Sequence, residues 1–237
     1  MRILVGTSGF SYDHWTGIFY PDNIKKNQWL GYYTEFFPTV ELNVTFYRLP
    51  KKETFKKWYN EVPGDFVFAL KGSRFITHIK RIKEVEDSVR IFKEQTRGLG
   101  RKLEVILWQL PPQMKVDLDR FSRFIKSLRI IKNRHAFEFR HKTWFCDEVY
   151  RILKDYNHAL CIADSPDWKT PLVVTADWFY LRFHGGSELY ASEYSKQELK
   201  GWAEKIKGWK RDGYIYFNND YQGFAVKNGI ELIELLT

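Results

Sequence analysis

The chain has 237 residues, a formal net charge of +9 and an apolar fraction of 44%. This length is within the range of one α/β barrel, and no run of about eighteen apolar residues is present, which excludes a membrane-spanning helix. The positive charge favours an anionic partner such as nucleic acid, although lysines that merely keep a surface soluble would produce the same balance.

The N-terminal residues and the cysteines indicate where the protein resides. The first residues, MRILVGTSG, contain one arginine and a short β-like run, and they lack the long apolar segment of a secretory signal. Cys146 and Cys161 have neither the spacing of metal ligands nor that of a redox pair, and isolated cysteines are typical of reduced thiols. We therefore predict a cytoplasmic protein with no membrane partner.

Strand-like and helix-like segments alternate along the chain with no linker between them. Apolar residues recur at steps of three and four in residues 84–97, 118–128, 196–210 and 224–236, which predicts amphipathic helices. Strands that alternate with helices pair in parallel, and eight such units predict a closed TIM-type (β/α) barrel in a single domain over residues 1–237. The expected strands are Ile3–Val5, Thr39–Asn43, Phe66–Leu70, Val105–Gln109, Ala136–Arg140, Leu160–Ala163, Trp178–Phe183 and Tyr214–Phe217.

One connection does not fit a regular barrel. The segment from Asp164 to Ala176 contains Pro166 and Pro171 and barely reaches the dozen residues that a parallel crossover needs. We expect either an irregular crossover between the sixth and seventh strands or a barrel whose wall is incomplete there.

Polar side chains follow almost every expected strand. Because the carboxyl ends of the strands form the site in such barrels, and because side chains alternate between interior and exterior, we placed the apolar set of each strand against the helices. Glu138 with Arg140, or Glu41 with Lys71, could instead form buried ion pairs that hold the barrel together, but buried charge is too costly for the whole set to serve that purpose. The residues assigned to the mouth are Asn43, Lys71, Gln109, Glu138, Arg140, Asp164, Arg182, His184, Asn218 and Asp220.

Motifs along the chain carry a family resemblance. They are GTSGFSY followed by a spaced W-x-G-x-F-Y-P (6–21), TVELNVTFYRLP (39–50), ITH (76–78), LWQLPP (107–112), EFRHKTW (138–144), RFHG (182–185) and YFNND (216–220). These motifs resemble the YecE-like family, domain of unknown function 72, over nearly the whole chain. The resemblance implies a TIM-barrel-like fold and implies no particular reaction.

The cations at the mouth predict an anionic ligand. Lys71, Arg140 and Arg182 would make the interior positive, and an arginine fork suits phosphate or carboxylate. Gly185 and Gly186 follow the seventh strand, and residues 218–223, with Asn219 among them, follow the eighth and lead into a helix. Loops at these two places hold phosphate in many barrels, so we expect an anion between them, although the glycines could serve only tight turns.

Aromatic side chains crowd the expected strand-end loops. Those left exposed would offer platforms on which bases or sugar rings stack, and the others would pack the loops onto the barrel. The aromatic residues assigned to substrate binding are Tyr12, Trp15 and Trp144.

The histidines near the mouth leave the cofactor unknown. His14, His78, His141 and His184 lie there, yet no pair has a recognised metal-ligand spacing, so a divalent metal stays open without supporting ligands. Hydrolysis of glycosides is disfavoured because the seventh strand carries Arg and His where a second acid would be needed.

Two classes of function follow from these patterns. The first is a hydrolase of the phosphodiesterase type, acting on nucleic acid or a nucleotide, with His184 or His141 as general acid/base and Asp164 or Asp220 orienting water or a metal. The second is a non-catalytic protein that binds nucleic acid or a phosphorylated small molecule. Many convergent polar strand ends favour the enzyme by analogy of fold. A basic segment after the third strand slightly favours nucleic acid; it contains Lys71, Arg74, Lys80, Arg81 and Lys83.

Overall fold

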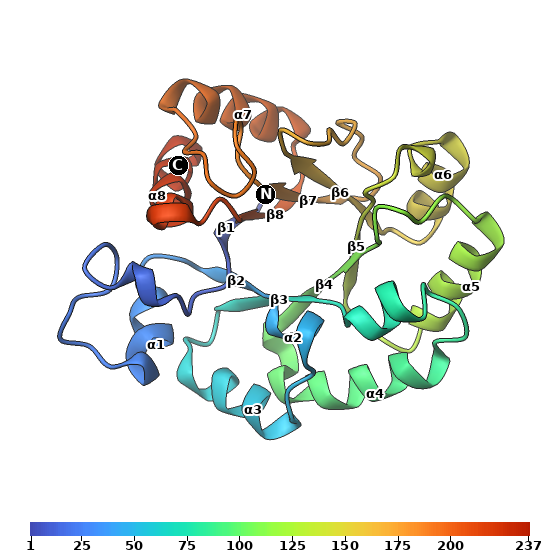
Figure 1. Ribbon diagram of the computed structural model, residues 1–237, viewed down its shortest axis with the longest axis horizontal. Helices are drawn as coiled ribbons and strands as arrows, with labels where there is room; N and C mark the ends of the chain where they lie inside the picture. The colour runs from blue at the N-terminus through green and yellow to red at the C-terminus, as the bar shows by residue number, and fades with distance from the viewer.

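The computed structural model describes residues 1–237 and contains a closed barrel of eight parallel strands ringed by helices (Figure 1). The first and last strands pair in parallel from Ile3 opposite Gly213 to Thr7 opposite Phe217, which closes the wall. The predicted TIM-type barrel is confirmed. The strands are β1 (Ile3–Ser8), β2 (Thr39–Leu42), β3 (Val67–Lys71), β4 (Leu103–Gln109), β5 (Arg134–Glu138), β6 (Ala159–Asp164), β7 (Trp178–Phe183) and β8 (Asp212–Phe217).

Side chains of mixed size fill the lower interior of the barrel. Ala69 and Ala136 come from strands on one side, while Trp178, Tyr180 and Tyr216 come from β7 and β8, and all are buried in one apolar cluster. Small residues facing large ones allow a closed sheet to be packed without a channel. The polar side chains at the strand ends lie on top of this packed layer.

Helices cover the outside of the barrel and bury the alternate side chains of the strands. Two of them begin with clear sequence signals: the Asp117 carboxylate accepts from the Arg120 amide, and Ser195 and Glu198 form a reciprocal capping box. The helices are α1 (Trp29–Tyr33), α2 (Val44–Tyr47), α3 (Lys52–Glu61), α4 (Glu86–Thr96), α5 (Leu118–Leu128), α6 (Asp147–Asp155), α7 (Lys196–Trp209) and α8 (Phe224–Leu236). No helix is long and apolar enough to cross a membrane.

The connection between β6 and β7 contains no helix. The expected irregular crossover is therefore confirmed, whereas an incomplete wall is not found, because Cys161 pairs with Tyr180 and Ala163 with Arg182 across the two strands. The segment places Trp168 over the mouth, where its ring lies 3.5 Å from the Arg140 guanidinium. The irregular crossover thus closes one side of the site.

Several strand ends differ from the predicted ones by one to three residues. Strand β5 ends at Glu138, so Arg140 lies in the following turn, and Asn43 precedes the helix α2 instead of ending β2. Strand β3 extends to Lys71. These shifts leave the side chains of Asn43, Lys71 and Arg140 at the same mouth.

Candidate functional site

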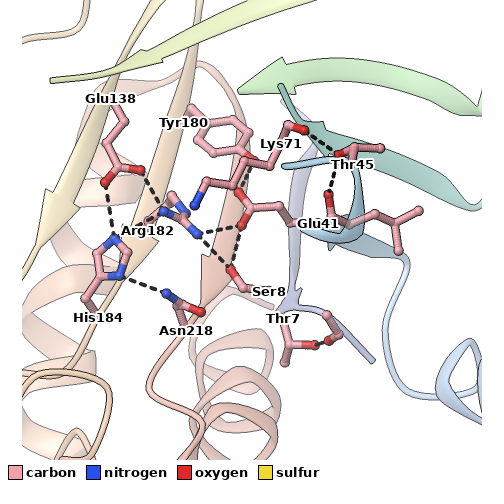
Figure 2. A network of polar contacts seen from close by, with 12 residues as sticks. Thr7, Ser8, Glu41, Thr45, Lys71, Glu138, Tyr180, Arg182, His184 and Asn218 are labelled. Atoms are coloured by element: carbon pink, nitrogen blue, oxygen red, sulfur yellow. Dashed lines mark hydrogen bonds and ion pairs between the residues drawn. The ribbon is translucent and has the colours of Figure 1, made fainter. Parts of the chain in front are cut away.

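Arg182 occupies the centre of the polar layer. Its side chain, 1% exposed, donates to Glu41 Oε1 at 2.8 Å and to Glu138 Oε2 at 2.6 Å, and so links β7 to β2 and β5 (Figure 2). Burial would lower the pKa of Arg182, but the two carboxylates raise it well above its ordinary value. Three buried charges persist only when they are paired and hydrogen-bonded. Arg182 is therefore a brace across the barrel whose charge is already balanced.

The Glu41 carboxylate has two further donors. Ser8 Oγ donates to Oε1 at 2.7 Å and the Tyr180 hydroxyl donates to Oε2 at 2.6 Å. Burial, followed by the nearby Glu41 charge, raises the pKa of Tyr180 well above its ordinary value, so its hydroxyl keeps its proton. Both oxygens of Glu41 are thus occupied by groups of the protein.

Glu138 is held ionised by cations on two sides. Arg140 Nε donates to Oε1 at 2.5 Å, while Arg182 donates to the other oxygen. Burial alone would raise the pKa of Glu138, but Arg140 and Arg182 hold it well below its usual range. The alternative of structural ion pairs is therefore found for Glu138 and Arg140, and Glu41 pairs with Arg182 instead of Lys71.

His184 is a neutral member of this network. Its Nδ1 lies 3.0 Å from the Asn218 amide nitrogen, and its Nε2 faces Glu138 Oε1 at 3.6 Å. Burial and the charge of Arg182 lower the pKa of His184 to about 4. The side chain is completely buried and does not line the cavity described below, so the predicted role as general acid/base is not supported by its position.

Lys71 differs from the two arginines because no carboxylate pairs with it. Its amine has no hydrogen bond or ion pair and lies 4.3 Å from the Phe46 ring centre, beside the Arg182 guanidinium (Figure 2). Burial, and then repulsion by Arg182, lower its pKa to about 8. The polar layer contains three cations, from Arg140, Arg182 and Lys71, and two carboxylates. It therefore has one positive charge in excess when Lys71 is protonated.

A cavity of about 920 Å³ opens above this layer, with Lys71 in its lining. Its rim is aromatic: the exposed fractions of Tyr47, Tyr190 and Tyr221 are 80%, 41% and 60%. A cavity of this size accommodates a ligand as large as a nucleotide. The lining residues are Tyr12, His14, Ile18, Asn43, Tyr47, Lys71, Arg182, Tyr190, Ala191, Asn218, Asp220, Tyr221 and Gln222.

A histidine–carboxylate pair borders the same cavity. His14 Nε2 lies 3.0 Å from Asp220 Oδ2, and Trp15 Nε1 donates to the other carboxylate oxygen at 2.7 Å. Burial raises the pKa of Asp220 to about 6 in spite of both partners. Trp15 is fully buried, so it orients Asp220 and offers no stacking surface. The pairing of His14 with Asp220 joins residues 206 positions apart, which no spacing in the sequence reveals.

Asp164 does not point into the mouth, which corrects the prediction. It lies among Tyr194, Trp202 and Glu198 of the outer layer, and burial raises its pKa. The rule that the apolar set faces the helices fails for β6 because ALCIAD is apolar at both parities. Ala163 therefore occupies the interior position beside Arg182.

His141 and Trp144 also lie outside the cavity, contrary to prediction. His141 Nδ1 accepts from the Thr143 amide and caps a short 3₁₀ turn. Trp144 is buried, stacks on Phe139 at 4.7 Å between ring centres and donates to the Met114 carbonyl. Both residues hold the β5–α6 connection and are not placed to touch a ligand at the mouth.

The two loops expected to hold an anion use their polar groups internally. The Gly185 amide, at a φ of 107°, donates to the Tyr194 hydroxyl at 3.1 Å. Gly186 is exposed outside the cavity lining, and the buried Asn219 amide donates to the Ser192 carbonyl. The expected anion position between these loops is therefore not formed, and the glycines serve the turn.

Buried polar atoms near the mouth that have no partner in the protein include Asn43 Oδ1, Gln109 Oε1, Arg182 Nε and Trp168 Nε1. A buried polar atom without a hydrogen bond is costly, so each calls for a partner from solvent or a ligand. The two acceptors among them suit a ligand with hydroxyl or amino groups.

Neither a metal centre nor a polymer groove is obvious from the side chains. No three His, Cys, Asp or Glu side chains lie together in a way that could hold a metal ion. Arg74, Lys80, Arg81 and Lys83 are exposed in the β3–α4 connection and do not line the cavity. Their charges lie beside the site, not in it.

Comparison with known proteins agrees with this architecture. The model of the family described as "Protein of unknown function DUF72" matches residues 4–237. The chain belongs to the DUF72 family. A crystal structure of a DUF72 family protein from Thermotoga maritima superposes with a TM-score of 0.88 at 31% sequence identity, covering 100% of this chain and 99% of that one.

Curated relatives of this DUF72 protein carry names that state no activity. UPF0759 protein YunF of Bacillus subtilis is 26% identical over 99% of this chain and 94% of its own length. UPF0759 protein YecE of Escherichia coli K12 is 25% identical over 75% of this chain and 73% of its own length. A D-psicose 3-epimerase crystallised in the presence of D-fructose has a TM-score of 0.54 at 11% identity, which is a likeness of fold alone.

Proposed function

We propose that this DUF72 protein is an enzyme that hydrolyses a phosphodiester bond of a nucleotide or of nucleic acid at the mouth of its barrel. The observation that carries the proposal is the amine of Lys71. It is the one cation of the polar layer without a carboxylate, it borders the cavity, and it leaves that layer with one excess positive charge. An anion beside it would balance the charge and raise its lowered pKa.

The rim of the cavity supports a ligand with flat rings. Tyr47, Tyr190 and Tyr221 expose their side chains above Lys71, and stacking on such rings tolerates every base. An anion at the floor and rings at the rim is the arrangement that a nucleotide needs. The exposed cations Arg74, Arg81 and Lys83 nearby would extend the positive field to further phosphates of a longer chain.

The pair of His14 and Asp220 supplies the chemistry. His14, oriented by the carboxylate at 3.0 Å, would accept a proton from a water molecule as its oxygen bonds to phosphorus, and would return a proton to the departing ester oxygen. Lys71 would balance the charge that develops on the phosphoryl oxygens. Arg182 and Arg140 act indirectly, by keeping the floor of the cavity rigid.

The test is hydrolysis of bis(4-nitrophenyl) phosphate by the full chain, followed through the released nitrophenolate. We expect His14→Asn to lower kcat by about 10²–10⁴-fold, the usual contribution of a positioned acid/base, with a smaller change in KM. His158→Asn is the control because His158 lies directly before β6, at the end of the barrel away from the mouth. If the wild type binds the ester but does not hydrolyse it, the protein is a binding protein and not an enzyme.

A further inference from the structure

A second cavity of about 420 Å³ adjoins the first between the β1–α1 connection and helix α3. Tyr12 and Asn43 line both cavities, so the two share a wall. The second cavity has the apolar side chains of Phe10, Leu30 and Trp58 in its lining, together with charged side chains. Nothing in the proposed hydrolysis of a simple ester requires this space.

The charges around the second cavity are already balanced. Lys26 Nζ lies 2.5 Å from an Asp13 carboxylate oxygen, and Lys57 Nζ lies 3.5 Å from Glu61 Oε1. The cavity therefore suits an uncharged ring and not a second phosphate, in contrast to the space above Lys71. Trp58 and Phe10 offer the aromatic surfaces on which such a ring would stack.

Asn43 lies at the border of the two spaces. Its Oδ1 is buried without a partner in the protein, so it can accept a hydrogen bond from a ligand that extends from one space to the other. Sugar hydroxyls and base amino groups are donors of the required kind. A ligand held by its phosphate at Lys71 would pass this atom on the way to the second cavity.

We infer that the ligand is a dinucleotide unit whose bridging phosphodiester lies at Lys71 and whose second base occupies the cavity beside Trp58. This inference rests on the proposed function, because it assumes a phosphate at Lys71. It narrows the substrate class from any phosphate ester to a diester with a nucleoside on each side. The other base of the dinucleotide stacks on the exposed tyrosines at the rim of the first cavity.

The test compares two probes by calorimetric titration of the full chain: the 5′-O-methyl phosphorothioate diester of adenosine and two adenosines joined by a phosphorothioate. Both probes carry one negative charge and resist hydrolysis. The wild type is expected to bind the two-base probe about tenfold more tightly, the order expected from stacking one further base. Trp58→Ala removes this preference and leaves the affinity for the one-base probe unchanged. Tyr59→Ala is the matched control, a half-buried aromatic of the same helix whose ring faces Gly100 and Lys102 instead of the cavity.

A second variant covers the case in which Trp58→Ala does not fold. Val44, 42% exposed, also lines the second cavity, and Val44→Phe would obstruct it and remove the same preference. Equal affinity of the wild type for both probes, or a preference that survives both changes, overturns the inference while the phosphate site stands. Failure of both probes to bind overturns the phosphate site at Lys71 and this inference with it.

Discussion

Two cations of the polar layer, Arg182 and Lys71, have different roles in the barrel. Arg182 is satisfied by Glu41 and Glu138, and its charge serves the fold. Lys71 is half-buried at the cavity and has no counter-ion; burial and the charge of Arg182 lower its pKa to about 8, and its charge is available to a ligand. Burial of a charge therefore marks a functional group only when the protein leaves the charge unpaired.

The largest effect should come from breaking the brace. Arg182→Met leaves Glu41 and Glu138 as two buried carboxylates without their shared cation, and we expect the free energy of unfolding to fall by about 3–5 kcal/mol in urea denaturation. Arg90→Met, which removes an exposed pair with Asp87, should cost no more than about 1 kcal/mol. A loss at Arg182 as small as that at Arg90 would show that the brace does not hold the barrel.

Removing the unpaired cation should have the reverse pattern. Lys71→Met deletes an amine that burial and Arg182 disfavour, so stability should be kept or increased, while affinity for adenosine 5′-monophosphate should fall by about 1.5–3 kcal/mol, the worth of a hydrogen bond to a charged group. The exposed Lys80→Met in the following segment is the matched control and should change neither quantity. Unchanged affinity in Lys71→Met would remove this residue from the site.

The sequence predicts which side chains enter the polar layer where polar and apolar residues alternate along a strand. It does not predict them where a strand is apolar throughout. Strand β7 ends in Arg182 and Phe183 and is followed by His184, and the apolar residue between the two polar ones sets the parity. In β6, Cys161, Ile162 and Ala163 are acceptable on either face, so the exterior position of Asp164 is not encoded locally. The ion pairs are harder still to predict from the sequence, because the counter-ions of Arg182 come from strands on other sides of the barrel.

The rim of the cavity shows a second limit of prediction from the sequence. Trp15 is expected from the sequence to be a loop aromatic available for stacking, yet it is buried and its indole nitrogen donates to Asp220. The partner His14 is one residue away in sequence from Trp15 but 206 from Asp220. A contact between the β1 and β8 loops exists only because the barrel closes, and closure is a property of the whole chain.

The pKa of Lys71 predicts how binding depends on pH. The protonated amine binds the anion, so affinity for adenosine 5′-monophosphate should be level between pH about 7 and 8, where the phosphate is fully ionised, and should decline as the amine of the free protein deprotonates above that range. In Lys71→Arg the decline should disappear, because a guanidinium stays charged. Equal affinity at pH 7 and pH 9.5 in the wild type would contradict an anion held by this amine.

The smallest effect concerns the acid limb of catalysis, at the other side of the cavity. Burial raises the pKa of Asp220 to about 6, and the ionised carboxylate is the form that orients His14 and stabilises its charge during proton transfer. The kcat/KM for bis(4-nitrophenyl) phosphate should therefore fall as pH drops through about 6, in a limb separate from the loss of anion binding above about 8. Asp220→Asn removes this titrating group, so the limb near pH 6 should be lost or displaced, at a lower plateau rate. The pKa of Asp220 is raised whereas that of Lys71 is lowered, because burial disfavours the charged form of both groups. The carboxylate loses its charge on acidification and the ammonium loses its charge on alkalinisation. An acid limb that is identical in position in wild type and Asp220→Asn would show that Asp220 only fastens the β8 loop to Trp15.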